Sequence, residues 1–423
     1  MKYSIFTTGC RANQYDSWVV EEKLKKAGFG ITNPQEADVV IVNSCTVTEN
    51  AEKDIRRFIF RTKSRNPKAK IVLMGCHAQV YPERNFGADL VLGQKEKFNF
   101  LKHIKDVGIL VGQLENNGAF DDLPYDFSVG SRTRFFLKIQ DGCSKYCTYC
   151  IVPFARGKPR SRSLTDILRV MRELKVKGIK EVVLTGIEIA SYYDESSGTD
   201  LKGLLRIIEN SETPERIRLS SIDPLYIDSE FVKILASSKK LAPSIHLPLQ
   251  SGSESILEKM GRNYTTKYIL EIVRELKTSV KNISVGLDII AGFPQEGDSE
   301  FAETLKCVKS LDAHYLHVFP FSPRDKTIAC KMKGMVEPDV KKSRVKVLKE
   351  LDRELRFAFY RKYLGYTLRI LPEKKLYEGK YLRGFSENYI PVFVEYKEEI
   401  INRFVEIKIK EIKGGRIFGE VLE

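Results

Sequence analysis

The sequence predicts an α/β protein built of three parts: an open parallel sheet, a partial barrel of strands and helices, and a small all-β barrel. Two stretches in which strand-sized apolar runs alternate with helical patterns predict the first two parts, because this order builds parallel sheets with crossover helices. A run of short strands without a helix at the end of the chain predicts the third. The 423 residues exceed the usual size of one hydrophobic core, so several domains are expected.

In the first part, four apolar runs have the length of strands, and a helical pattern covers 16–27. The four runs are 3–7, 38–43, 70–74 and 89–92. Cys10, Cys45 and Cys76 each follow one of the first three runs within four residues. Because the carboxyl ends of parallel strands share one edge of a sheet, we expect these thiols to converge there. Such a group favours a metal site, and three inert buried thiols remain the alternative. We assign residues 1–111 to this domain and the polar stretch 112–132 to a linker.

The second part, residues 133–363, contains six strand candidates. They are 134–139, 181–185, 216–222, 244–249, 284–290 and 315–320. Helical patterns lie between several of them, at 165–177, 201–210 and 299–311, and Thr165 is the expected N-cap of the first. Six strand-helix units predict an open, partial barrel rather than a closed eight-fold one. Functional residues are then expected at the carboxyl ends of the strands.

The last part, residues 364–423, follows a long charged helix at 338–363. Short strands separated by turn signals, including Glu378-Gly379 and Gly414-Gly415, predict a small all-β barrel. Domains of this size and class often bind RNA.

The charge of the chain suggests a polyanionic partner. Its net charge is +14, and residues 51–70 hold eight basic side chains against two acidic ones. Clustered Lys and Arg gain affinity for phosphates by releasing counterions, which makes RNA the leading candidate. Four more basic residues follow the cysteines near position 150: Arg156, Lys158, Arg160 and Arg162. The alternative is a set of solvated helix faces rich in Lys and Glu.

Residues 143–150 carry three cysteines, Cys143, Cys147 and Cys150, in the spacing CxxxCxxC, with Tyr149 before the last. Three thiolates leave one iron of an iron-sulfur cluster free to bind a small molecule. Zinc is the weaker alternative, because a structural zinc ion takes four ligands and no fourth Cys or His lies nearby in the sequence. Coincidence is a further alternative. Eight cysteines are too few for a disulfide scaffold, so we expect a reducing compartment, the cytoplasm. The longest apolar runs have the length of strands, so we expect no membrane span.

The CxxxCxxC octet resembles the cluster loop of the radical S-adenosylmethionine (SAM) superfamily, and the whole chain resembles the methylthiotransferases of that superfamily. Residues 9–15, Gly-Cys-Arg-Ala-Asn-Gln-Tyr, and 45–48, Cys-Thr-Val-Thr, look most like the branch that acts on N6-threonylcarbamoyladenosine at position 37 of tRNA. The resemblance implies two [4Fe-4S] clusters and conversion of the adenine C2–H bond to C2–S–CH3. It further implies that SAM gives both the methyl group and the radical, and that an electron donor such as flavodoxin or ferredoxin is needed.

The resemblance also implies roles for individual residues. Cys143, Cys147 and Cys150 would hold the radical-generating cluster, and Cys10, Cys45 and Cys76 an auxiliary cluster that presents sulfur. The expected SAM contacts are Tyr149, Gly186, Glu188, Ser220, Gln250 and Asp288. The expected contacts with the tRNA anticodon stem-loop are Arg56, Arg57, Arg61 and Arg160, together with a C-terminal domain of the TRAM type. Cys307 and Cys330 are interpreted as ordinary free thiols.

Three other functions compete with this one. Two keep the chemistry and change the substrate, to isopentenyladenosine-37 of tRNA or to an aspartate of ribosomal protein S12. The third, from another class, is a non-enzymatic RNA-binding protein with structural metal sites.

Overall fold

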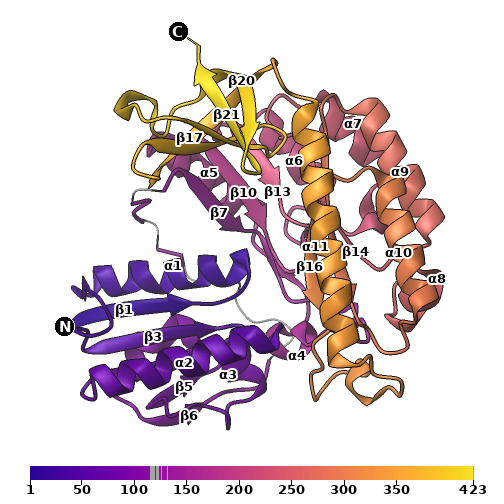
Figure 1. Ribbon diagram of the computed structural model, residues 1–423. Helices are drawn as coiled ribbons and strands as arrows, with labels where there is room; N and C mark the ends of the chain where they lie inside the picture. The colour runs from indigo at the N-terminus through magenta and orange to yellow at the C-terminus, as the bar shows by residue number, and fades with distance from the viewer. Residues whose placement is uncertain (115–119, 121–122, 125, 131, 423) are drawn as a thin grey trace.

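The computed structural model describes residues 1–114, 120, 123–124, 126–130 and 132–422, so the expected linker lies partly outside the described residues. The chain forms an N-terminal sheet domain, a central partial barrel and a C-terminal β-barrel (Figure 1). This arrangement confirms the predicted fold class. Among the described helices, none is long and apolar enough to cross a membrane.

The N-terminal domain is a six-stranded parallel sheet in the order β2-β1-β3-β4-β5-β6. Its strands are β1 (Lys2–Thr7), β2 (Gly30–Ile31), β3 (Val39–Ser44), β4 (Lys70–Gly75), β5 (Leu90–Leu92) and β6 (Gly108–Leu110). Its helices are α1 (Arg11–Lys26), α2 (Glu49–Arg65), α3 (Cys76–Val80) and η1 (Glu96–His103). Strands β1, β3 and β4 are neighbours, so the three cysteines that follow them lie at one edge of the sheet. The expected helix at 16–27 begins earlier, at Arg11.

The central part is a partial barrel with six parallel strands. They are β7 (Arg134–Lys138), β10 (Glu181–Thr185), β13 (Arg216–Leu219), β14 (Ser244–Gln250), β15 (Ser284–Ala291) and β16 (Tyr315–Pro320). The first three pair in the order β7-β10-β13 and the last three in the order β14-β15-β16. A parallel bridge from Ile217 to Leu241 and a backbone hydrogen bond from Ile222 to His246 connect the two halves.

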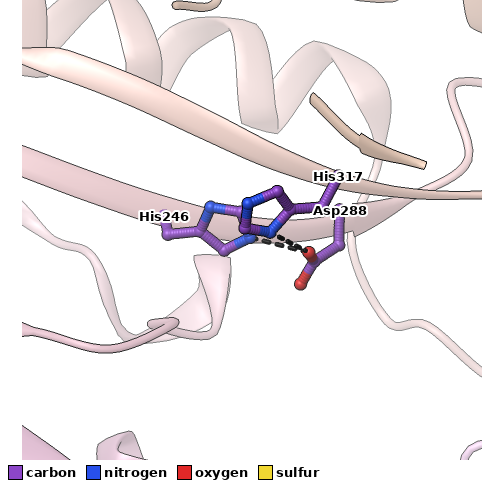
Figure 2. Close-up of side chains that lie close together, drawn as sticks. All are labelled: His246, Asp288 and His317. Carbon is purple, nitrogen blue, oxygen red and sulfur yellow. Dashed lines mark ion pairs between the residues drawn. The ribbon is translucent and has the colours of Figure 1, made fainter. Parts of the chain in front are cut away.

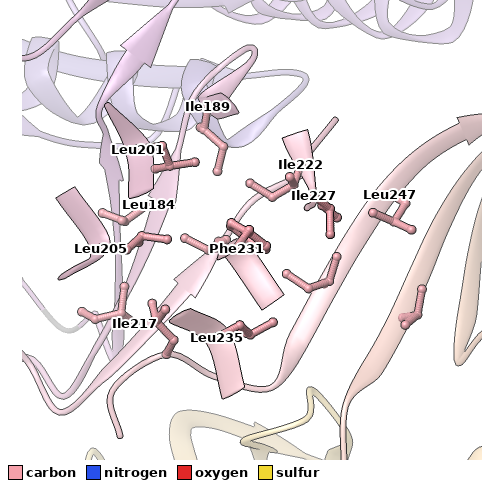
Figure 3. Packing of buried hydrophobic residues seen from close by; sticks show 14 of the residues in the cluster. Leu184, Ile189, Leu201, Leu205, Ile217, Ile222, Ile227, Phe231, Leu235 and Leu247 are labelled. Carbon is pink, nitrogen blue, oxygen red and sulfur yellow. The ribbon is translucent and has the colours of Figure 1, made fainter. Parts of the chain in front are cut away.

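Helices cover the outer face of this barrel (Figure 1). They are α5 (Leu164–Val176), α6 (Leu201–Glu209), α7 (Ser229–Ser237), α8 (Glu254–Lys259), α9 (Thr266–Ser279), α10 (Asp298–Leu311) and α11 (Pro338–Arg361). Shorter elements complete it: α4 (Val152–Arg156), β8 (Gln140–Asp141), β9 (Arg160–Ser161), β11 (Tyr193–Asp194), β12 (Thr199–Asp200), η2 (Ile189–Ser191), η3 (Pro224–Tyr226) and η4 (Ala329–Lys331). Buried hydrophobic side chains of strands and helices, such as Leu184, Leu205 and Phe231, pack together in the core (Figure 3).

The predicted cap of α5 was wrong. Helix α5 is capped by Ser163, whose hydroxyl accepts a hydrogen bond from the backbone N–H of Asp166, and Thr165 lies inside the first turn. Both residue types favour a cap, and the extended backbone of Ser163 decides between them.

The C-terminal part is a closed barrel in the strand order β17-β18-β19-β21-β20. Its strands are β17 (Thr367–Tyr377), β18 (Tyr381–Ser386), β19 (Pro391–Glu395), β20 (Val405–Lys413) and β21 (Arg416–Val421), with η5 (Glu398–Ile400) before β20. Two arginines of β13 hold it against the partial barrel. Arg216 donates to the carbonyls of Phe385 and Arg369, and Arg218 donates to those of Ser386 and Glu387.

Candidate active site at the meeting point of three domains

A cavity of about 800 Å³ lies where the three parts of the chain meet. The N-terminal domain contributes the loops after β1 and β3, including Cys10 and Cys45. The partial barrel contributes the ends of its strands, including Gly186 and Ser220. The C-terminal barrel contributes Tyr389. The position at the carboxyl ends of parallel strands is the one where such folds bind ligands.

The first group of cysteines is packed tightly at the edge of the N-terminal sheet. Gly9 has a φ of +95°, and a Cβ atom at this position would lie 2.6 Å from Cβ of Cys45, so glycine is needed for the close approach. Burial, with the charges of Cys76 and Cys10 adding to it, raises the pKa of Cys45 to about 12. Burial also raises the pKa of Cys76. The charges of neighbouring groups therefore contribute to the pKa of both Cys45 and Cys76.

A buried network of charged side chains lies beneath this group. Arg156, only 1% exposed, donates to Asp141 Oδ1 (2.8 Å), Asp16 Oδ2 (3.0 Å) and Asn13 Oδ1 (2.6 Å), and its Nε lies 3.4 Å from Cys76 Sγ. This arginine of the partial barrel thus connects directly to helix α1 and to a cysteine of the N-terminal domain.

Two buried lysines complete the network. Lys138 Nζ lies 2.6 Å from Asp16 and 3.0 Å from Asp141, and Lys97 Nζ lies 2.6 Å from Asp16. Burial raises the pKa of Asp16, but the lysines and Arg156 outweigh it and hold this pKa well below its usual range. Three basic and two acidic side chains leave one net positive charge in the network.

The second group, Cys143, Cys147 and Cys150, lies in the loop after β7 and β8. Burial, with the charges of Cys147 and Cys143, raises the pKa of Cys150 to about 12. Arg262 Nη1 lies 3.5 Å from Cys147 Sγ, so a guanidinium accompanies this group too. All eight cysteines of the chain are free of disulfide bonds.

The arrangement of both groups fits a bulky anionic cofactor better than a single ion. A zinc ion with Zn–S distances of about 2.3 Å would hold its thiolates within roughly 4.6 Å of one another. Within the described part of the chain, neither cysteine group is that compact, because the only set with ligand atoms within 4.8 Å is His246, Asp288 and His317. An iron-sulfur cluster spreads its cysteine ligands further and suits the net positive charge beside Cys76.

Half of the expected SAM contacts lie in the cavity with Cys10 and Cys45, and its described lining includes none of the three cysteines of the second group. Gly186, Ser220 and Asp288 line the cavity. A Cβ atom on Gly186 would meet the Gln140 carbonyl oxygen at 2.7 Å, which explains the glycine. The carboxylate of Glu188 lies 2.9 Å from Lys145 Nζ, and the same ammonium lies 2.5 Å from Asp223. A positive group therefore already sits between these two carboxylates.

Glu188 and the two remaining expected SAM contacts lie outside the described cavity lining. Tyr149 packs edge-to-face against Phe293, with 6.5 Å between ring centroids. Gln250 ends β14 with a φ of +67°, an uncommon conformation for a residue other than glycine.

The arginines that follow position 150 are mostly buried. Arg156 and Arg162 are 1% and 3% exposed, so neither adds charge to a surface that could bind RNA. Arg160 is half-buried and lies 3.5 Å from Asp141. By contrast, Arg56, Arg57 and Arg61 are exposed on helix α2. The beginning of this helix, including Asn50 and Asp54, lines the cavity, and the three arginines lie further along the same helix.

Several cavity residues were not predicted as site residues. His317 and His246 both face Asp288 (Figure 2): His246 Nε2 lies 2.8 Å and His317 Nδ1 3.3 Å from Asp288 Oδ1. Burial raises the pKa of Asp288, but the two imidazoles outweigh it and lower this pKa to about 2. Arg11 and Tyr389 also line the cavity, with Arg11 Nη2 donating to the Tyr389 hydroxyl at 3.0 Å.

Comparison with known proteins identifies the class of this site. The family described as the radical SAM superfamily matches residues 137–308, and the uncharacterized protein family UPF0004 matches residues 2–93. The radical SAM methyltransferase TsrM from Kitasatospora setae shares the fold, with a TM-score of 0.55 at 18% identity over 78% of this chain and 77% of that one. The partial barrel, the octet and these matches define a radical SAM protein.

Curated relatives show which radical SAM proteins this chain resembles in sequence. Threonylcarbamoyladenosine tRNA methylthiotransferase MtaB of Aquifex aeolicus is 39% identical over 97% of this chain and 100% of its own length. The protein of the same name from Thermotoga maritima is 35% identical over 96% of this chain and 94% of its own. A tRNA-2-methylthio-N(6)-dimethylallyladenosine synthase of Thermosipho africanus is 32% identical over the full length of both. The chain belongs to the radical SAM methylthiotransferases.

Proposed function

We propose that this enzyme methylthiolates C2 of N6-threonylcarbamoyladenosine at position 37 of tRNA. The observation that carries the proposal is the single cavity of about 800 Å³ that has Cys10 and Cys45 on one side and the barrel strand ends on the other. The relatives named for this nucleoside, at 33–39% identity over nearly the whole chain, support it. Residues 1–111, 133–363 and 364–423 form its three domains, with 112–132 as linker.

Two groups of residues hold the cofactors. Cys143, Cys147 and Cys150 hold one [4Fe-4S] cluster, and Cys10, Cys45 and Cys76 hold a second. When bound, these clusters and SAM supply the radical, the sulfur and the methyl group. The chain itself positions them: Arg156 and Arg262 approach a cysteine of each group, and Gly186 lets the end of β10 pack closely against the Gln140 carbonyl.

The tRNA reaches the cavity by its anticodon stem-loop. Unpaired bases of an RNA loop can be splayed out and inserted into a protein pocket, and basic side chains hold the backbone. Arg56, Arg57 and Arg61 on α2 supply this charge beside the cavity, and Arg160 adds to it from the partial barrel. An electron donor such as flavodoxin or ferredoxin completes the reaction, which takes place in the cytoplasm with the tRNA.

Complementation of a bacterial strain that lacks methylthiolated threonylcarbamoyladenosine tests the proposal. Mass spectrometry of tRNA nucleosides should detect this product when the strain expresses the wild-type chain, and the product should be missing with the Cys147→Ala variant. A product formed only on dimethylallyladenosine would reassign the substrate. If neither nucleoside changes although the purified protein holds its clusters, a binding role replaces the enzymatic one.

A further inference from the structure

We propose that Arg11 and the polar wall beside it form a subsite for the carboxylate of the threonylcarbamoyl group. This inference rests on the proposed function and names the residues that would select its substrate. The relatives fall into two classes by name, one acting on a threonylcarbamoyl and the other on a dimethylallyl derivative of adenosine. The first substituent carries a carboxylate and a hydroxyl, whereas the second is a hydrocarbon.

The geometry of adenine places the subsite next to the sulfur site. In the purine ring, C2 and C6 are both bonded to N1, so the reacting carbon and the N6 substituent lie on the same edge. A residue that binds the substituent must therefore lie close to the cysteines that would hold the auxiliary cluster. Arg11 directly follows Cys10, and both line the cavity.

Arg11 has hydrogen-bonding capacity left for a ligand. A guanidinium carries five N–H donors, and the described contacts of Arg11 are one hydrogen bond to the Tyr389 hydroxyl and a position over the Phe136 ring, 5.6 Å from its centroid. Among the described residues, no carboxylate forms an ion pair with it. The other cavity arginine, Arg218, instead donates hydrogen bonds to the carbonyls of Ser386 and Glu387.

The rest of the wall is polar and held in place. The Tyr315 hydroxyl lies 3.0 Å from His246 Nδ1, and Gly286 leaves room for the Tyr315 ring, since a Cβ atom there would lie 2.2 Å from it. His246 and His317 are both oriented by Asp288 (Figure 2), and His317 is half exposed toward the cavity. These groups can bind the hydroxyl and carbonyl oxygens of the same substituent.

The C-terminal barrel takes part in the subsite. Tyr389 reaches the cavity from a turn with a φ of +67°, and its ring lies beneath the Arg218 guanidinium, 4.8 Å from centroid to Cζ. Its hydroxyl orients Arg11, so it acts as a positioning residue. An apolar dimethylallyl group in this place would leave the remaining N–H donors of Arg11 without a partner, and a site built to hydrogen-bond its substrate rejects an analogue that lacks the bonding group.

The test compares two RNA stem-loops of identical sequence that differ only in one group. One bears threonylcarbamoyladenosine, and the other bears the same nucleoside with its carboxylate converted to a primary amide. Binding to the holoenzyme is measured under anaerobic conditions by fluorescence anisotropy, together with kcat/KM for methylthiolation. For the wild-type enzyme we expect the acid to bind about 10- to 100-fold more tightly than the amide, the range of a lost charge-assisted hydrogen bond.

Arg11→Met should bind both stem-loops equally and weakly, and Arg11→Lys should recover part of the preference. Tyr389→Phe should reduce the preference several-fold. Arg57→Met is the matched control: it removes a guanidinium from helix α2, so it should weaken both stem-loops equally and keep the preference. Iron content of each variant shows that the fold is retained.

A preference for the acid that persists in Arg11→Met would overturn the subsite, as would equal binding of both stem-loops by the wild-type enzyme. Failure of the proposed function looks different, because the wild-type enzyme would then methylthiolate neither stem-loop. Anisotropy measures the preference independently of turnover, so the two failures are distinguishable.

Discussion

Replacing Arg156 by methionine should destabilise the contact between the N-terminal domain and the partial barrel. The substitution keeps an unbranched stem and removes a buried guanidinium that bonds to Asp141, Asp16 and Asn13. Breaking a buried ion pair costs about 3–5 kcal/mol. Both carboxylates keep a lysine at 3.0 Å or closer, so we expect the lower end, about 3 kcal/mol.

The chain carries a suitable probe for this experiment. Trp18 is the only tryptophan, and it packs edge-to-face on Phe135 of β7 at 4.6 Å between centroids. Its fluorescence during urea unfolding of the apo-protein therefore reports on the contact between α1 and the partial barrel.

Arg160→Met provides the matched control. It makes the same substitution near the same carboxylate, but the Arg160 side chain is 20% exposed and 3.5 Å from Asp141, so its loss should cost less than ~1 kcal/mol. Adding Asp141→Asn to Arg156→Met should return part of the lost stability, because the carboxylate left with fewer partners is then gone. Equal unfolding free energies for Arg156→Met and Arg160→Met would refute the reasoning.

Three further predictions follow from the geometry of the cavity. Gly9→Ala would force a Cβ atom against Cys45, so the reconstituted protein should lose about half its iron, whereas Gly28→Ala, also at positive φ but in open space, should keep it. Arg61→Gln should lower the slope of log Kd against log salt for the tRNA by about 1, and an unchanged slope would remove Arg61 from the interface. The histidine partners of Asp288 lower its pKa to about 2. A carboxyl group whose pKa is lowered on folding stabilises the fold above about pH 4, and this contribution is lost as the pH falls through 2. Asp288→Asn should therefore cost about 2 kcal/mol at pH 6 and less at pH 3 in urea unfolding, and a cost that grows on acidification would contradict this sign.

The positions of the six cysteines in the fold could be predicted because they depend on short-range order, and their role as cluster ligands stays a prediction. Each of Cys10, Cys45 and Cys76 follows a strand that is readable from its apolar run, and the parallel topology then brings them to one edge of the sheet. The octet is contiguous and needs no folding argument at all. The strands and the partial barrel follow from the same alternation of apolar runs and helical patterns.

The subsite and the buried network could not be predicted, because they depend on how separate parts of the chain dock. Arg11 is separated by 378 positions from Tyr389, His317 lies on another element, and no local pattern indicates that the three line one cavity. Arg156 lies in a basic stretch that resembles a solvated RNA-binding surface. Its burial depends on the docking of helix α1, which brings Asp16 to 3.0 Å from the Arg156 guanidinium.

The division of labour between the two groups of cysteines is the central claim, and two variants test it most directly. Purified Cys147→Ala and Cys45→Ala proteins are reconstituted anaerobically and given SAM, reductant and threonylcarbamoyladenosine stem-loop, and both 5′-deoxyadenosine and methylthiolated product are measured. Cys147→Ala should form neither. Cys45→Ala should still form 5′-deoxyadenosine while losing the methylthiolated product. Equal loss of both products in the two folded variants would contradict the assignment of radical generation to one group and sulfur delivery to the other.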